Sequence, residues 1–97
     1  MKIEMGNTYF EGSGNGKFGV LALVKVIGEF EQNNQQFYEV EFVKNYASKW
    51  EKKVPKPGEK TLTAENKLYN SFNRAKDNFI KNMNFENERD IIGYIFN

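Results

Sequence analysis

The longest apolar run in this chain, GNGKFGVLALVKVIG, extends from Gly14 to Gly28. Side chains alternate between the two faces of a β-strand, and as far as Leu23 both faces of this run are apolar. A strand that is apolar on both faces is expected to be covered on both. The run therefore predicts an interior strand around which the other elements pair or pack. It falls short of the roughly twenty apolar residues that a membrane-spanning helix requires.

The size and composition of the chain limit what can be built around that strand. Ninety-seven residues, of which 39% are hydrophobic and 15% aromatic, predict a single folded domain, 1–97, with a small core. The absence of Cys and His excludes a disulfide framework and a Cys/His zinc site, so we expect no metal. The first ten residues lack the apolar stretch of a signal peptide. We therefore expect a cytoplasmic protein with no membrane partner.

The second apolar segment, QFYEVEFV, alternates cleanly and predicts a strand joined to the first by a hairpin. We expect a three-residue loop, Gln32 to Asn34, with Asn in the left-handed conformation. A two-residue loop would set Val26 against Glu41, which is a poorer cross-strand pair. The register that follows from the three-residue loop pairs Lys25 with Glu41, Val26 with Val40, Val24 with Phe42, Leu23 with Val43, and Gly28 with Tyr38.

Three further segments complete the expected fold. A short β-prone piece from Met1 leads into a glycine-rich turn from Gly12 to Gly16. The segment 44–60 contains two prolines and is expected to be irregular, with a short edge strand near Lys49 to Val54. A helix capped by Thr61 or Thr63 is expected to continue to about Met83. Its apolar face consists of Leu68, Phe72, Ala75, Phe79 and Met83.

The packing of that helix defines the expected fold class. We expect it to lie on the sheet face that carries the valines of the central strand, with Tyr38, Val40 and Phe42. Residues 88–96 fit a short helix after Asn87 or an edge strand, and this choice stays open. The predicted fold class is α+β: a small antiparallel sheet of about three to four strands, covered by one long helix from the C-terminal half, with or without a short terminal helix.

Two patterns suggest chemistry but do not support it. Gly14, Gly16 and Gly19 match G-x-G-x-x-G, yet here the glycines precede a strand, whereas in a dinucleotide-binding loop they follow one. A protein kinase needs its lysine on a later strand, and Lys25 lies on the same strand as the glycines. Without His or Cys, no nucleophile and base stand out. We therefore interpret the glycines as a turn and expect no cofactor, no catalytic residue and no enzyme.

The charge of the chain is unevenly distributed. Residues 44–83 hold ten basic and four acidic side chains, whereas the first 43 residues hold three and six. Lysines contact phosphates and aromatic rings stack on bases, so the middle of the chain supplies a candidate surface for nucleic acid or an acidic partner. Its members are Lys44, Tyr46, Lys49, Trp50, Lys52, Lys53, Lys56, Lys60, Lys67, Arg74 and Lys81. An acidic candidate surface consists of Glu29, Glu31, Glu39 and Glu41. The alternative, that the lysines only keep a loop soluble and Trp50 covers the sheet edge, stays open.

The N-terminal half resembles the opening sheet of phage HNH endonucleases and related Apetala-type DNA-binding modules. The resemblance rests on Gly6-x-x-Tyr9-Phe10, on the strand that begins Gly16-Lys17-Phe18-Gly19, and on Tyr38 to Phe42. The segment Leu68 to Phe72 is similar to a helix of such phage proteins. The cysteines and histidines that bind metal or cleave DNA in that family are absent here. The resemblance implies a phage or mobile-element protein with a small sheet and a helix, and no nuclease activity.

Two functions are consistent with these features. In the first, the protein is a phage-type inhibitor that binds a host nucleic-acid machine, such as a CRISPR effector or another defence nuclease, through its charged surfaces. In the second, it binds DNA or RNA directly through the basic 44–60 segment and the basic helix face. The partner is accordingly a host protein, a protein–nucleic acid complex or nucleic acid itself. We favour the inhibitor, because the acidic hairpin would repel a DNA backbone.

Overall fold

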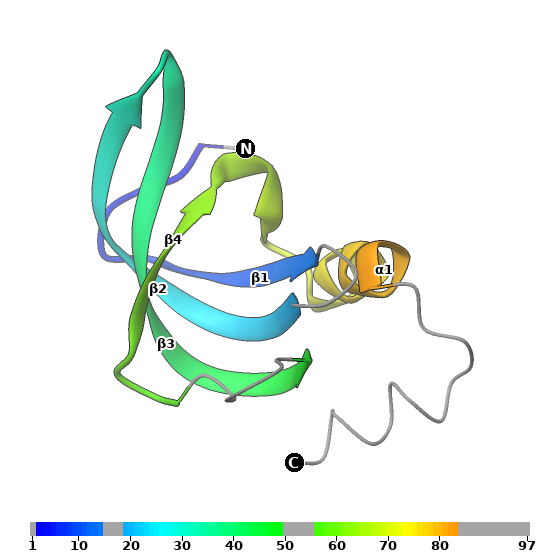
Figure 1. The fold of residues 1–97 in the computed structure, drawn as a ribbon. Coiled ribbons are helices and arrows are strands. Elements are labelled where there is room, and N and C mark those ends of the chain that lie inside the picture. Colours follow the sequence, from blue (N-terminus) through cyan, green and yellow to red (C-terminus); the bar gives the residue numbers. More distant parts are fainter. Residues whose placement is uncertain (1, 15–18, 50–55, 84–97) are drawn as a thin grey trace.

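The structure, a computed structural model, describes residues 2–14, 19–49 and 56–83 (Figure 1). The elements follow one another as β1 (Thr8–Gly14), β2 (Gly19–Gln32), β3 (Gln35–Lys49), β4 (Lys60–Ala64), the 3-10 turn η1 (Glu65–Lys67), β5 (Leu68–Tyr69) and α1 (Phe72–Met83). The fold is α+β, as predicted, with a five-stranded antiparallel sheet and one helix. The predicted terminal helix or strand at 88–96 lies outside the described residues.

The strand order β4-β3-β2-β1-β5 makes β2 the central strand, which confirms the prediction from its apolar run. β4 pairs with β3 at one edge of the sheet, and β5 pairs with β1 at the other. Only η1 separates β4 from β5 in the chain, so residues 60–69 pass from one edge of the sheet to the other. Figure 1 shows the strands curling around the space that this segment crosses. The sheet therefore encloses an interior of its own.

The helix is shorter than predicted and begins later. Thr61 and Thr63, expected as helix caps, lie in β4 opposite Val40 and Tyr38, because alternating β-branched residues fit a paired strand better than a helix. The helix begins at Phe72 instead, where the Ser71 hydroxyl accepts a hydrogen bond from the Arg74 backbone N–H at 3.4 Å. α1 has 12 residues. Within the described part of the chain, no helix is long and apolar enough to cross a membrane.

The β2–β3 hairpin reaches the predicted central register by a different route. Lys25 lies opposite Glu41, Val24 opposite Phe42 and Val26 opposite Val40, as predicted. The loop, however, has two residues, Asn33 and Asn34, both at positive φ (53° and 65°), as a tight hairpin turn requires. A β-bulge between Val26 and Gly28 compensates for the missing loop residue. The predicted pairs outside the centre are wrong: Gly28 lies opposite Glu39, and Leu23 lies opposite Lys44.

Two other predicted boundaries are also wrong. Gly12 and Gly14 belong to β1 rather than to a turn, and Gly14 pairs with Gly19. The rest of the predicted turn, residues 15–16, lies outside the described part. The segment 44–49, expected to be irregular, continues β3 as far as Lys49. Irregularities after Leu21 and Leu23 let β3 follow β2 through its bend, because bulges increase the local twist of a strand pair.

Each face of the sheet carries its own core, and the helix lies on the face opposite to the one predicted. The valines of β2 point into the curled interior together with Tyr9, Ala22, Tyr38, Val40, Phe42, Leu68 and Ile3. α1 instead buries Ala75 and Phe79 against Leu21 and Ala47, on the other face. Leu68 was expected on the helix and belongs to the interior through β5. Residues 60–69 cross the interior face of the sheet, so the helix packs on the opposite face.

The helix can approach the sheet closely because Gly12 has no side chain. A Cβ atom at this position would lie 2.0 Å from the backbone oxygen of Ala75. The Asn78 side chain donates a hydrogen bond of 2.7 Å to the Gly12 carbonyl oxygen. Phe72 packs beside these contacts, 5.7 Å from the ring of Phe10 and 5.1 Å from the ring of Tyr46. The contact between α1 and the sheet is thus closely packed.

Candidate binding site at the hairpin arm and its pocket

The β2–β3 hairpin extends beyond the end of β1, and we call residues 28–39 the arm; on its β3 side, Phe37 to Glu39 pair with β4. β1 pairs with β2 only as far as Lys25, and the turn before β1 covers one further residue, through hydrogen bonds of 2.8 and 3.0 Å between Val26 and the backbone of Gly6 and Asn7. Beyond that point, no described strand pairs with this edge of β2. Figure 1 shows the arm projecting from the sheet. Its free edge leaves both backbone and side chains accessible to a partner.

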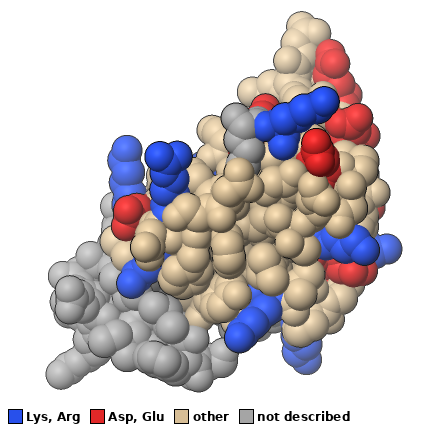
Figure 2. All heavy atoms as spheres, turned by 180° about the vertical axis from the view of Figure 1, so that it is seen from behind, with Lys and Arg blue, Asp and Glu red and all other residues tan. Residues whose placement is uncertain are grey.

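The arm is the most acidic segment of the sheet. Residues 28–39 contain Glu29, Glu31 and Glu39 and no Lys or Arg. Glu29 and Glu31 are exposed, and Glu39 is half-buried. Figure 2, which views the molecule from behind, shows acidic side chains along the arm at the upper right. The fourth predicted acidic residue, Glu41, lies outside the arm opposite Lys25 and Lys60, which offset its charge.

Two aromatic rings accompany these carboxylates. Phe30 and Phe37 lie opposite each other on β2 and β3, with ring centroids 5.8 Å apart and planes inclined by 26°. Phe30 remains 37% exposed. A stacked pair with one exposed ring, among carboxylates, offers an apolar contact and negative charge together.

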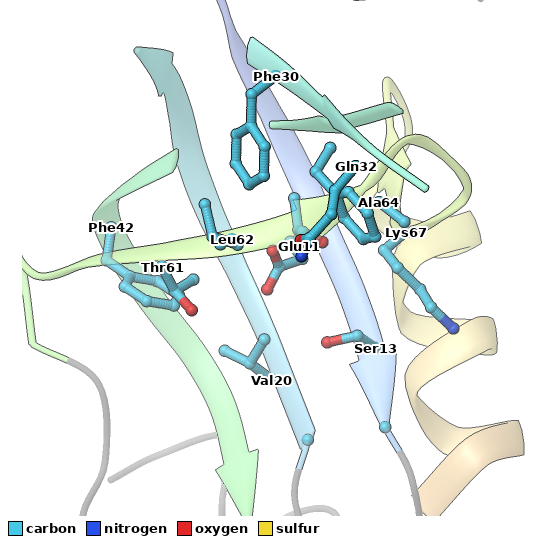
Figure 3. Close-up of a pocket in the computed structure, with 14 residues that line it drawn as sticks. Glu11, Ser13, Val20, Phe30, Gln32, Phe42, Thr61, Leu62, Ala64 and Lys67 are labelled. Carbon is cyan, nitrogen blue, oxygen red and sulfur yellow. The ribbon is translucent and has the colours of Figure 1, made fainter. Parts of the chain in front are cut away.

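A pocket of about 490 Å³ lies between the arm and the β1–β2 pair. This volume is within the range of roughly 300–1,000 Å³ that small-ligand sites occupy. Figure 3 shows Phe30 directed toward Leu62 and Glu11 from above, with Val20 and Ser13 below them. The lining comes from all four long strands and η1: Glu11, Ser13, Gly14, Gly19, Val20, Phe30, Gln32, Phe37, Phe42, Thr61, Leu62, Thr63, Ala64 and Lys67.

Glu11 is the unusual residue of this pocket. Its side chain is only 2% exposed, and Oε1 has no hydrogen-bond partner. Burial raises the pKa of the Glu11 carboxyl from its usual 4.5 to about 7, although a hydrogen bond with Thr63 and the charge of Lys67 both oppose the rise. At neutral pH the carboxyl is therefore divided between its protonated and ionised forms.

The sequence did not single out Glu11, although a signal was present. On β1, residues 9, 11 and 13 share one face, and Tyr9 on that face is buried in the interior core. Glu11 lies opposite Ala22, whose side chain belongs to the same core. A glutamate in register with an interior alanine is a buried carboxyl, but this becomes apparent only once β1 is paired with β2.

The predicted basic surface is distributed over several elements. Lys44 lies on β3 with its Nζ 5.3 Å from the centre of the Tyr46 ring, Lys56 precedes β4, and Lys60 lies on β4. Lys67, expected on the helix, lies on η1, whereas Arg74 and Lys81 are exposed on α1. Tyr46 is half-buried against Phe10 and Phe72. The side chain of Lys49 and all of Trp50, Lys52 and Lys53 lie outside the described part, so this surface stays a prediction.

Comparisons with known proteins leave the site to be interpreted on its own. No family model matches the chain, and neither a curated protein nor a solved structure matches it significantly. Among the described residues, no three acidic side chains lie close enough together to hold a metal ion. The site consists of an acidic arm with one exposed aromatic ring, Phe30, beside a pocket lined by the buried Glu11.

Proposed function

We propose that the protein is a non-enzymatic inhibitor that docks its arm in the cationic nucleic-acid groove of a host nucleic-acid machine, such as a CRISPR effector or another defence nuclease. The observation that carries this proposal is the arm itself. It projects from the sheet, its three glutamates have no basic residue among them, and its β2 edge has no partner strand in the described structure.

The arm offers what such a groove binds. Nucleic-acid grooves hold the backbone with Lys and Arg and stack rings on the bases. Glu29 and Glu31, two residues apart on one strand, place carboxylates about 7 Å apart along an extended edge. Phe30 lies between them in sequence and stacks on Phe37, so an apolar ring accompanies the charges. An acidic, aromatic strand can thus occupy a groove that otherwise holds nucleic acid.

The alternative is that the protein binds DNA or RNA directly through its basic residues. The exposed Arg74 and Lys81 on α1 favour it. The acidic arm opposes it, because three carboxylates on a projecting element repel a phosphate backbone. The two functions differ in the molecule that is bound, and so one set of measurements can separate them.

The test is inhibition of purified RNA-guided nucleases and other defence nucleases cleaving a DNA substrate. We expect the native protein to inhibit at least one of them, and the triple variant Glu29→Gln, Glu31→Gln, Glu39→Gln to inhibit at least about tenfold more weakly, which corresponds to about 1.4 kcal/mol. Inhibition should also weaken as salt rises. Asp77→Asn, which removes an exposed carboxylate from α1, is the matched control and should inhibit like the native protein.

Direct binding to random duplex DNA is measured in parallel. Salt-dependent binding to DNA, with no nuclease inhibited, would overturn the inhibitor and support the direct binder. Equal inhibition by the triple variant and the native protein would show that the arm is not the docking element.

A further inference from the structure

The Glu11 carboxyl is incompletely satisfied by the protein itself. Thr63 supplies one hydrogen bond, but the buried Oε1 has no partner, and Glu11 is one of the residues that line the pocket. Buried polar atoms in folded proteins nearly always have a hydrogen-bond partner. An unpaired acceptor on a side chain that lines a cavity therefore points to a donor brought by a ligand.

The other walls of the pocket define what kind of donor fits. Phe30, Phe37 and Phe42 supply aromatic surface, and the small polar side chains of Ser13 and Thr61 lie on the same lining. Figure 3 shows the rings of Phe30 and Phe42 on two sides of Glu11. A carboxylate among aromatic rings suits a planar guanidinium, which donates in a fork to the two carboxylate oxygens and packs its flat faces on rings.

The protein's own cation does not fill this place. Lys67 is the only basic residue among the described residues that line the pocket. In Figure 3 its side chain leads away from Glu11 toward α1. Lys67 acts on Glu11 through its charge, while the hydrogen-bonding position at Oε1 is left to another donor.

We propose that the pocket binds the guanidinium side chain of an arginine, with Glu11 as its carboxylate partner and Phe30 and Phe42 as its walls. Because Phe30, Gln32 and Phe37 of the arm also line the pocket, a protein that docks on the arm can insert an arginine into it. The assignment of the arginine to the docked partner rests on the proposed function. Binding of a guanidinium by the pocket does not.

The ionisation of Glu11 supplies a second, independent signature. Only the ionised carboxylate pairs with a cation, and burial raises the pKa of this group to about 7. The groups that surround it are the cationic Lys67 on η1 and the neutral hydroxyl of Thr63 on β4. Arginine binding should therefore tighten between pH 6 and pH 8 and displace a proton from Glu11.

The experiment titrates the native protein with N-acetyl-arginine N-methylamide and follows backbone amide chemical shifts by NMR. We expect saturable shifts centred on Glu11, Ser13 and Thr63. The citrulline analogue, which replaces guanidinium by a neutral urea of the same shape, should bind at least about tenfold more weakly. The variant Glu11→Gln should lose the preference for arginine, whereas the control Asp77→Asn should retain it.

A titration with N-acetyl-lysine N-methylamide completes the set. Three results would overturn the assignment of arginine to the pocket: equal binding of the arginine and citrulline analogues, unchanged arginine binding by Glu11→Gln, or stronger binding of the lysine analogue than of the arginine analogue. Failure of the pocket can be told apart from failure of the inhibitor. Arginine binding without nuclease inhibition keeps the pocket and removes the inhibitor. Nuclease inhibition without arginine binding keeps the arm and removes the pocket.

Discussion

The two faces of the sheet are built on opposite terms. On the helix face, Gly12 lies directly against the backbone of Ala75, and Phe79 is completely buried. On the pocket face, Phe30 is partly exposed, and Glu11, which lines the pocket, keeps a carboxyl oxygen without a hydrogen-bond partner. The same strands β1, β2 and β3 supply both faces. Close packing on one face holds these strands in place, so that the other face can retain groups that do not contribute to stability.

The largest expected effect lies on the helix face. The variant Gly12→Ala places a methyl group 2.0 Å from the Ala75 carbonyl oxygen. The clashing atoms are backbone atoms, which cannot rotate away as a side chain could. We expect the free energy of unfolding to fall by about 4 kcal/mol, measured by urea denaturation. Gly28→Ala, whose new methyl group would come no closer than 3.6 Å to any neighbour, is the control. Equal stability of the two variants would contradict the close approach of helix and sheet.

The second prediction tests the pocket face through pH. Because the pKa of Glu11 is raised from 4.5 to about 7, the unfolded chain releases this proton first, and stability falls as pH rises from 4.5 to 7. The total loss is about 3 kcal/mol, and above pH 7 it stays constant. Glu11→Gln should lack this loss, so the variant gains stability relative to the native protein as pH rises. Parallel unfolding curves of the two proteins from pH 4.5 to 8 would contradict a buried carboxyl.

How far the sequence predicts this fold follows from how local each signal is. The apolar run of β2 and the pair of Lys25 and Glu41 depend on alternation along two neighbouring strands, and both are confirmed. The loop was predicted one residue too long, yet the central pairs were right, because the bulge after Val26 restores the residue that the turn lacks. A three-residue loop and a two-residue loop with a one-residue bulge give the same central pairs, so these pairs alone do not distinguish them.

The features that sequence reasoning missed depend on contacts between distant segments. Leu68 lies four residues before Phe72, which is helical spacing, but pairing with Glu11 on β1 makes it a strand residue. The helix was assigned to the wrong face because the crossing of residues 60–69 over the interior cannot be read from periodicity. Glu11 was missed for the same reason, since its burial follows from strand pairing.

A third and smaller effect is expected from the hydrogen bond that links α1 to β1. Asn78 donates its side-chain N–H to the Gly12 carbonyl oxygen at 2.7 Å, and its own backbone oxygen accepts from Asn82 at 2.7 Å. The variant Asn78→Ala leaves the Gly12 oxygen without this donor, which should lower the free energy of unfolding by about 1–2 kcal/mol. Asn82→Ala, which removes only the contact within the helix, should cost less. A larger loss from Asn82→Ala would show that the helix itself, rather than its link to β1, limits stability.

The smallest effect on stability is expected in the arm. Phe30 is 37% exposed, and its main described contact is the ring of Phe37, so Phe30→Ala should lower the free energy of unfolding by about 1 kcal/mol or less. The effect of Phe30→Ala on binding should be larger than its effect on stability, because the same ring forms a wall of the Glu11 pocket and an exposed part of the arm. We expect nuclease inhibition and arginine binding to weaken by about tenfold, while the urea midpoint barely changes.

Phe79→Leu is the converse control, since it alters the buried helix contact and should reduce stability without changing binding. If Phe30→Ala instead destabilised the protein as much as Phe79→Leu, the arm would be part of the core, and the contrast between the two faces would not hold.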